Sequence, residues 1–267
     1  MPVSRQQHAS SPPATEYAIT IPGRSRPVTS NQAGVHARLA EIVARHLKTP
    51  NRRPIATHTV AAFHQAARWA EPLARPLILD SGCGIGESTA RLAQRHPDAL
   101  VIGVDKSRHR LDKHRPPPDL DTLKNYRLVQ AELGDFWRLA TAAGWRVTHH
   151  YLFYPNPWPK AAHVQYRWHG SPAFPALLRL GGQLEIRSNW NAYIEEFAAA
   201  LQIAGYGCRV EELAAIQPLT PFERKYYASG HRLWRCQADL GPADADAFRP
   251  AAADMRYSET FNYREAK

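Results

Sequence analysis

Short apolar runs alternate with amphipathic stretches through the middle of the chain. Five runs have the length and composition of buried strands, at residues 76–81, 99–105, 126–132, 149–155 and 183–189. The stretches that follow them place apolar residues at helical spacing, at residues 87–95, 107–115, 135–143, 172–179 and 192–203. Regular alternation of this kind predicts a mostly parallel sheet with helices on both faces.

The two ends of the chain are patterned differently from the middle. Helical spacing also covers residues 31–47 and 57–69, ahead of the first strand. Residues 1–30 are rich in Ser, Pro, Arg and Gln with little apolar periodicity, so we expect a flexible basic arm there. Residues 241–267 are weakly patterned and are expected to form a tail. The predicted organisation is one domain at residues 31–240 between these two ends.

Composition limits the classes of protein that the chain could belong to. No apolar run approaches the roughly 18 residues that a membrane span needs, and the start does not resemble a signal peptide, so we expect a cytoplasmic location. The 34 Lys and Arg against 24 Asp and Glu give a net charge of +10, which favours a polyanionic partner such as nucleic acid. Cys83, Cys208 and Cys236 lie far apart, which predicts neither a disulfide framework nor a metal site.

A glycine loop follows the first predicted strand of the alternating region. The stretch DSGCGIGES at residues 80–88 places Gly82, Gly84 and Gly86 where a ligand can approach the backbone closely. Asp105 lies at the end of the next strand, where a carboxylate can accept hydrogen bonds from both hydroxyls of a ribose. Together these features predict a site for a nucleoside-containing cofactor.

NAD and S-adenosylmethionine both fit such a site. The dinucleotide pattern GxGxxG is absent, and the loop carries no Arg or Lys to bind a pyrophosphate. Asp80 precedes the glycines at the point where a methionine ammonium would need an anion. These details favour S-adenosylmethionine. Glu132, at the end of the third strand, falls where the adenine ring would lie, and Asp135 competes with it for that role.

A proline-rich segment, LFYPNPWPK, ends the fourth predicted strand at residues 152–160. Proline has no amide hydrogen for a sheet ladder, so the segment must leave the sheet as a stiff loop. The loop presents Asn156, Trp158 and Lys160 together. It is either a structural corner or a platform that holds a flat polar substrate.

Four segments in order resemble the bacterial tRNA (guanine-N(7))-methyltransferases of the TrmB type. They are GRSRPVTSNQ (23–32), LDSGCGIGES (79–88), FYPNPWPKAAH (153–163) and PLTPFERKYYASGHRLW (218–234), and the resemblance spans about residues 22–240. It implies a class I S-adenosylmethionine-dependent methyltransferase fold, which is Rossmann-like with a mostly parallel seven-stranded sheet. It also implies tRNA as partner, S-adenosylmethionine as cofactor and guanine N(7) as acceptor.

The resemblance also assigns roles to residues. Thr220 and Glu223 would contact the donor or the target guanine, with Phe222 packed beneath them, although the same residues also suit a helix N-terminus. Asn156 and Thr220 would lie beside the donor. Lys160, Asn189, Thr220 and Glu223 would contact the substrate.

The sequence departs from the family pattern where the acceptor should bind. Asn156 stands in place of an aspartate, Ser188 and Asn189 replace threonine and aspartate, and the basic cluster after the loop is reduced to His163 and Arg167. Guanine N(7) carries a lone pair and no proton, so methyl transfer needs positioning and charge stabilisation rather than a base. With two carboxylates replaced by amides, Asn156 and Glu223 are the candidate catalytic residues.

Two other functions fit these departures. An Asn-Pro-aromatic corner resembles the NPPY element of amino-group methyltransferases, in which an amide oxygen accepts the protons of a substrate amine. The second alternative function is that of a non-catalytic RNA-binding protein that keeps the donor pocket. The aromatic and basic residues 166–169 suit either base stacking or packing over the sheet, and Arg24, Arg26 and Lys225 are candidates for phosphate contact. The oligomeric state, monomer or homodimer, stays open.

Overall fold

The computed structural model describes residues 25–116, 118–214 and 218–241. Seven strands form one sheet in the order β3-β2-β1-β4-β5-β7-β6. Neighbouring strands pair in parallel, except that β7 is antiparallel to both β5 and β6. The strand bounds are β1 Leu77–Ser81, β2 Leu100–Asp105, β3 Tyr126–Gln130, β4 His149–Phe153, β5 Gln183–Ser188, β6 Arg209–Glu212 and β7 Trp234–Asp239.

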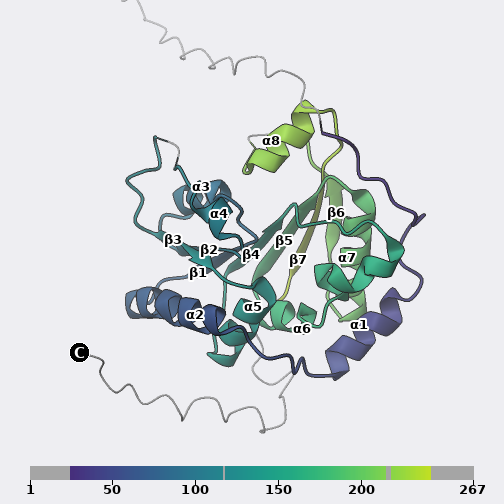
Figure 1. The fold of residues 1–267 in the computed structure, drawn as a ribbon, viewed down its shortest axis with the longest axis horizontal. Coiled ribbons are helices and arrows are strands. Elements are labelled where there is room, and N and C mark those ends of the chain that lie inside the picture. The colour runs from purple at the N-terminus through teal and green to yellow at the C-terminus, as the bar shows by residue number, and fades with distance from the viewer. Residues whose placement is uncertain (1–24, 117, 215–217, 242–267) are drawn as a thin grey trace, which may run out of the picture.

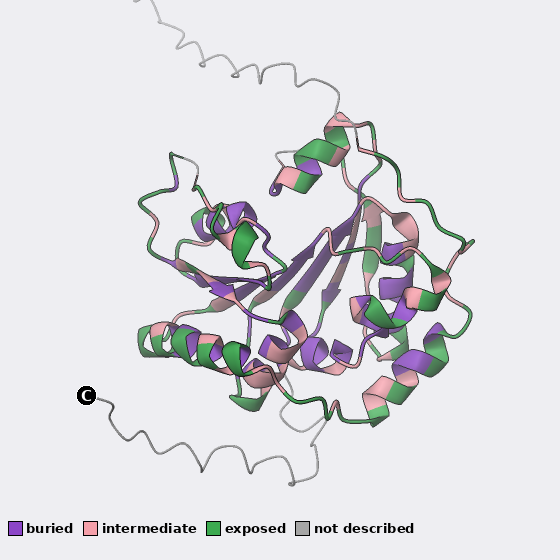
Figure 2. Ribbon diagram, in the orientation of Figure 1, coloured by how far each residue is buried: buried purple, intermediate pink, exposed green. Residues whose placement is uncertain are grey.

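Helices cover the two faces of the sheet unequally (Figure 1). One face packs against α1 (Leu39–Lys48), α2 (Thr57–Ala70), α5 (Leu133–Ala142), α6 (Phe174–Arg179) and α7 (Asn191–Ile203), and this layer holds the larger core. The other face carries α3 (Glu87–Arg95) and α4 (Arg108–Leu111) over a smaller core. The last helix, α8 (Pro221–Ala228), is more exposed than the sheet strands (Figure 2).

Three short 3-10 helices complete the described elements: η1 (Glu71–Leu73), η2 (Ala161–Tyr166) and η3 (Trp168–Gly170). The central strands β1 and β2 are apolar and almost wholly buried, as expected for parallel strands covered on both faces. Within the described residues, no helix is both long and apolar enough to cross a membrane.

The predicted alternation of strands and helices and the class I methyltransferase fold are confirmed. The helix at residues 87–95 has the predicted bounds. The helix predicted at residues 31–47 is wrong at its start, because α1 begins only at Leu39 and residues 31–36 bind other parts of the chain instead. The helix N-terminus that the sequence allowed at Thr220–Glu223 is confirmed as the start of α8, whereas sequence reasoning did not assign β6 or β7.

The helix predicted at residues 107–115 is also too long, since α4 ends at Leu111. The His114 ring turns back to the glycine loop, where Nδ1 lies 2.8 Å from the Ile85 carbonyl oxygen and Nε2 lies 3.0 Å from the Tyr126 hydroxyl. The carbonyl oxygen can only accept, so Nδ1 is the nitrogen that donates to it. Of the predicted basic arm, residues 25–30 are described, whereas residues 1–24 and the predicted tail from residue 242 lie outside the described residues.

Candidate active site

The glycine loop joins the end of β1 to the start of α3. Gly82, Gly84 and Gly86 have φ values of 79°, 61° and 77°, in the left-handed region that other residues enter only with strain. A Cβ added at Gly82 or Gly84 would meet no atom within 4 Å, so the backbone there borders open space. At Gly86 a Cβ would lie 2.5 Å from Leu128 Cδ1, so a side chain there would have to displace Leu128 as well as adopt a strained backbone.

Asp80 lies beneath the loop with only 1% of its surface exposed. Its Oδ2 accepts hydrogen bonds from the hydroxyls of Ser88 (2.6 Å) and Thr89 (2.7 Å), both in the first turn of α3. Its Oδ1 is buried and has no hydrogen-bond partner among the described residues. Burial raises the pKa of Asp80 to about 6, and the two hydroxyls only partly oppose this rise. One carboxylate oxygen is therefore left for a group that the chain does not supply.

Asp105 closes the other side of the loop. Its Oδ2 accepts the Gly84 N–H (3.0 Å) and its Oδ1 accepts the Ser107 N–H (2.8 Å). The Arg110 guanidinium, which is half exposed, approaches Oδ2 at 3.5 Å. The carboxylate is thus fixed by two backbone amides, and its ion-pair partner Arg110 is half exposed.

Helix α8 is tied to the glycine loop from above. Both guanidinium nitrogens of Arg224 contact the Glu87 carboxylate, at 2.6 Å and 2.7 Å, and Glu87 begins α3. The helix itself starts with a side-chain cap, because Thr220 Oγ1 accepts the Glu223 N–H at 3.0 Å. This contact brings the segment at residues 218–234 next to the predicted donor site.

Glu223 has partners on both of its carboxylate oxygens. Oε1 accepts from the Arg187 guanidinium at 2.7 Å, and Oε2 accepts the Leu219 N–H at 2.9 Å. Arg187 also contacts Glu185 and lies over the Phe153 ring, 4.9 Å from its centroid. Glu223 therefore links α8 to the end of β5 and to the last residue of β4.

The loop after β4 forms the acceptor corner, which we define as residues 154–160. Asn156 is exposed, and its Oδ1 accepts the Trp158 N–H at 3.3 Å. Tyr154 and Trp158 both have a left-handed backbone, with φ values of 49° and 46°. Such strain at two residues other than glycine persists only where surrounding contacts impose it.

A buried ion pair holds the part of this loop from Trp158 to Lys160. Arg167 is fully buried, and its guanidinium donates to the carbonyl oxygens of Trp158 (3.0 Å) and Lys160 (3.2 Å). The same guanidinium contacts the Glu196 carboxylate of α7, which is also fully buried. His169 Nε2 lies 2.9 Å from the same carboxylate. Burial would raise the pKa of Glu196, but hydrogen bonds from His169 and Arg167 hold it at about 2.

The segment at residues 25–31, called here the strap, runs from the end of α8 to the loop after β4. At one end the Ser25 N–H donates to Ser229 Oγ (3.2 Å), and the Ser25 carbonyl oxygen accepts from His231 Nε2 (3.1 Å). At the other end Asn31 Oδ1 accepts the Ala161 N–H at 3.0 Å. The strap therefore connects the end of α8 to the acceptor corner.

Asn189 holds the strap indirectly. A carbonyl oxygen can only accept, so His231 donates to Ser25 from Nε2, and its Nδ1 faces Asn189. Asn189 Nδ2 lies 3.1 Å from that Nδ1 and donates to it. A carboxylate at position 189 would have no hydrogen to donate to this ring nitrogen. This gives a structural reason for an amide where the family pattern has a carboxylate.

Comparisons with known proteins show which family the chain resembles. A family model described as "Putative methyltransferase" matches residues 74–236, which is more than half of the chain. The tRNA (guanine-N(7)-)-methyltransferase of Nitrosomonas europaea is 30% identical over 179 residues, which cover 59% of this chain and 73% of that protein. The enzyme of the same name from Nitrosospira multiformis is 28% identical over 170 residues, which cover 60% of this chain and 72% of that protein.

The chain belongs to the tRNA (guanine-N(7)-)-methyltransferase family. Among solved structures, the 16S rRNA methyltransferase KamB gives a TM-score of 0.48 at 17% identity, covering 73% of this chain and 99% of that chain. A match at that level does not bear on the substrate of this family member.

The structure brings most of the predicted site residues of this family member to one end of the sheet. The donor loop touches α8 through Glu87 and Arg224, and α8 touches the acceptor corner through the Tyr154 and Tyr226 rings, whose centroids are 5.5 Å apart. Lys160 is exposed on the acceptor corner. Thr220 is buried and caps α8.

Other predicted residues have different surroundings. Glu132 precedes α5 with an exposed side chain, and its N–H donates to Thr59 Oγ1 at 3.0 Å. Its adenine role stays a prediction. Asp135 accepts the Ala56 N–H at 3.0 Å and an Arg138 N–H, so it holds the start of α2. Phe222, expected to pack beneath the site, is instead 42% exposed.

For residues 166–169 the packing interpretation is confirmed at Arg167 and His169, which are fully buried. Sequence reasoning missed the partners that matter most here, namely Glu196, Gln32 and Arg224. Gln32 donates to Glu196 and its Oε1 accepts from Arg167 at 3.1 Å. For Glu196 the sequence signal was a charged residue within an otherwise apolar helical stretch, and that signal does not identify a partner.

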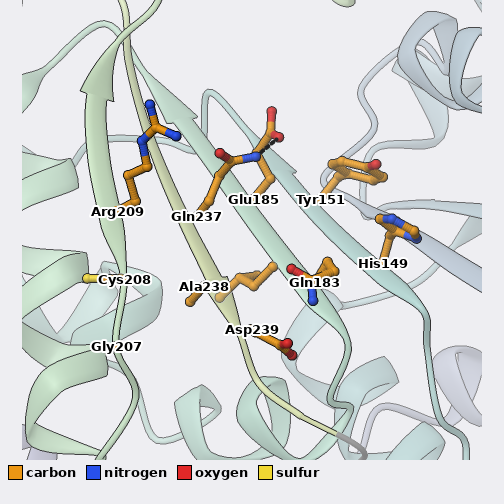
Figure 3. A pocket seen from close by; sticks show the side chains of 11 residues that line it. His149, Tyr151, Gln183, Glu185, Gly207, Cys208, Arg209, Gln237, Ala238 and Asp239 are labelled. Atoms are coloured by element: carbon orange, nitrogen blue, oxygen red, sulfur yellow. Dashed lines mark hydrogen bonds between the residues drawn. The ribbon is translucent and has the colours of Figure 1, made fainter.

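A separate pocket of about 520 Å³ lies on the sheet face that carries α3, over β4, β5 and β7 (Figure 3). Polar side chains line it, including His149, Glu185 and Gln237, and Gln237 Nε2 donates to Glu185 Oε2 at 2.9 Å. None of the predicted site residues lines this pocket. The residues predicted to bind the donor and the acceptor lie instead towards the carboxyl ends of the parallel strands, where ligands bind in open α/β sheets.

Proposed function

We propose that this chain transfers a methyl group from S-adenosylmethionine to N(7) of a guanine in tRNA. The observation that carries the proposal is the glycine loop, which borders open space between the unpartnered Asp80 Oδ1 and the carboxylate of Asp105. Family membership and the nearby acceptor corner support the choice of acceptor.

The residues at the loop fit this cofactor. A buried carboxylate oxygen without a partner suits the ammonium of the methionine portion, because an unpaired buried anion is costly until a cation reaches it. The open backbone at Gly82 and Gly84 leaves room that any side chain would fill. Asp105 would accept hydrogen bonds from the ribose hydroxyls once Arg110 moves aside.

When bound, S-adenosylmethionine supplies an electrophilic methyl group on a sulfonium centre. The chain has only to hold a guanine with its N(7) lone pair in line, since no proton leaves that nitrogen. The stiff acceptor corner provides the wall, with Asn156 exposed on it and Lys160 beside it. We propose that Glu223 is the anion that favours the positive charge that develops on the purine, and Oε1 would have to release Arg187 to reach the base.

A direct assay tests the activity. The purified protein is incubated with labelled S-adenosylmethionine and unmodified tRNA, and the methylated nucleoside is identified after digestion. N(7)-methylguanosine is the expected product. An N-methylated amine would instead support the amino-group reaction at the Asn-Pro-Trp corner, and no product would support the non-catalytic RNA-binding function.

Replacing Asn156 by aspartate should raise the rate of guanine methylation. The atom that shapes the turn is Oδ1, which accepts from the Trp158 N–H, and a carboxylate keeps that acceptor. The amide nitrogen of Asn156 makes no hydrogen bond within the described residues, so its loss costs no contact there. The added negative charge would favour the cationic product. Single-turnover rates with saturating tRNA measure the effect, which we expect to be about tenfold, as for a modest change in electrostatic stabilisation.

Asn156→Ser is the matched control for this variant. A serine hydroxyl at position 156 can also accept a hydrogen bond from the Trp158 N–H, but it adds no charge. Its rate should not exceed that of the unaltered protein. If Asn156→Asp turns over no faster than Asn156→Ser, the charge explanation is wrong.

The proposed partner is tRNA, bound through cations around the site. Arg26 on the strap, Lys160 on the acceptor corner and Lys225 on α8 are all exposed and form no ion pair within the described residues. Arg24 lies outside the described residues. We place the activity in the cytoplasm, as the composition predicted.

A further inference from the structure

Three aromatic rings form a cluster beside the acceptor corner, called here the aromatic triangle: Trp158, His163 and Tyr166. The ring centroids lie 5.1 Å (Trp158–Tyr166), 5.5 Å (His163–Tyr166) and 5.7 Å (Trp158–His163) apart. Trp158 is 36% exposed and Tyr166 is 52% exposed. Large aromatic rings that cluster while facing water are typical of a surface that binds something.

The triangle is held in place from below. Arg167 follows Tyr166 directly and donates to the carbonyl oxygens of Trp158 and Lys160. Glu196 anchors the guanidinium, and the Arg167 side chain also lies over the Trp190 ring, 5.0 Å from its centroid. A fully buried arginine, two strained backbone residues and an ion pair thus support a loop whose rings stay at the surface. Such support keeps the rings from folding inward.

Charge around the triangle selects the kind of partner. Residues 154–170 contain no Asp or Glu, and Lys160 within this segment is exposed. The strap hydrogen-bonds to this loop, through Ser30 to the Pro159 carbonyl oxygen and through Asn31 to the Ala161 N–H. An exposed ring next to cations fits a nucleobase and its phosphate, since every base has a flat face that stacks on an aromatic side chain.

We propose that the aromatic triangle is a stacking platform for an unpaired nucleobase of the RNA substrate, a neighbour of the guanine that is methylated. The inference rests on the proposed function, because it assigns the base to that same RNA. It adds a substrate class: RNA in which the nucleotide beside the target is unpaired. In fully paired RNA the bases stack on each other and offer no free face.

Equilibrium binding tests the platform without turnover. Dissociation constants are measured in the presence of S-adenosylhomocysteine for an unmodified tRNA transcript and for a fully paired RNA duplex of equal length, across a range of salt. Tyr166→Leu should raise the dissociation constant for tRNA about tenfold, the effect of losing one base–aromatic stack. Its affinity for the duplex and its salt dependence should match those of the unaltered protein.

Three further variants separate stacking from other causes. Tyr166→Phe keeps the ring and should retain tRNA affinity, whereas Lys160→Ala should lower the slope of log affinity against log salt by about 0.7–0.9. Tyr227→Leu removes a tyrosine of similar exposure, 57%, that has no ring contact within the described residues, and it should bind tRNA normally. If Tyr166→Leu does not fold, His163→Leu should show the same weaker binding of tRNA with unchanged affinity for the duplex.

The platform is refuted if the leucine variant binds tRNA as the unaltered protein does, or if it loses affinity for the duplex equally. Loss of the salt slope in that variant would also refute it, because the ring would then act through phosphate contact. Failure of the proposed function looks different. In that case the unaltered protein makes no N(7)-methylguanosine, whatever the binding measurements give.

Discussion

Replacing Glu196 by alanine should lower the free energy of unfolding by about 3–5 kcal/mol, the usual cost of leaving a buried charge unpaired. Arg167 would keep its full burial but lose its carboxylate, and the His36 N–H and the His169 ring would lose the same acceptor. Urea unfolding at pH 7 measures the change. Glu195→Ala is the control, because Glu195 is the exposed neighbour on the same helix and should have little effect.

Glu196→Ala should also lower activity. Arg167 fixes the acceptor corner, so a variant that still folds should lose turnover at saturating tRNA while its affinity for S-adenosylhomocysteine is kept. The double variant Arg167→Met with Glu196→Leu should recover much of the unfolding free energy, since replacing both partners leaves no buried charge. That variant should not recover activity. If it does, the ion pair does not position the corner.

The same carboxylate sets a pH dependence. The pKa of Glu196 in the folded chain is about 2, below its ordinary value of 4.5. A carboxyl group with a lowered pKa stabilises the folded state above its unfolded pKa, and the contribution is lost as pH falls toward the folded value. The difference in stability between the unaltered protein and Glu196→Gln should therefore be constant above about pH 5 and shrink between about pH 4.5 and 2.

Replacing Asp80 by asparagine should abolish donor binding and stabilise the free protein at the same time. The pKa of Asp80 is raised from 3.8 to about 6, chiefly by burial, so the ionised carboxylate at pH 7 costs up to about 3 kcal/mol relative to the unfolded chain. Asparagine still accepts from the Ser88 and Thr89 hydroxyls but carries no charge. Calorimetric titration with S-adenosylmethionine should detect no binding.

The sign of the stability effect can be checked with pH. A carboxyl group with a raised pKa favours folding while it is protonated, and that advantage is lost as pH rises through the folded value. The gain from Asp80→Asn should therefore be full above about pH 7 and vanish near pH 4. Asp98→Asn, an exposed control, should change neither stability nor binding. A destabilised Asp80→Asn protein that still binds the donor would show that Asp80 is only structural.

The geometry of the predicted donor loop was largely readable from the sequence. Asp80 and Gly82, Gly84 and Gly86 are consecutive or nearly so, and their chemistry depends on the local path of the chain from β1 into α3. Asp105 could be placed beside them because parallel strands of successive β-α units end at the same edge of the sheet. The local chain path and the shared edge of successive parallel strands were sufficient to predict this loop and its carboxylates.

The acceptor half was only partly readable. The prolines predicted a stiff corner, but not that Arg167 holds it from within the core, nor that Asn189 donates to His231 and thereby secures the strap. The helix predicted from residue 31 failed for the same reason, since Asn31 and Gln32 bond to residues more than a hundred positions away. Helical spacing does not report such partners.

By itself the sequence determined the alternating architecture, the glycine loop and the carboxylates beside it, because each depends on neighbours along the chain or on strand order. The tertiary structure alone decided which charges are buried against each other and which rings stay exposed. The Arg167–Glu196 pair joins segments 29 residues apart, and the strap reaches His231 across 206 residues. The burial that makes these contacts strong exists only once the core has formed.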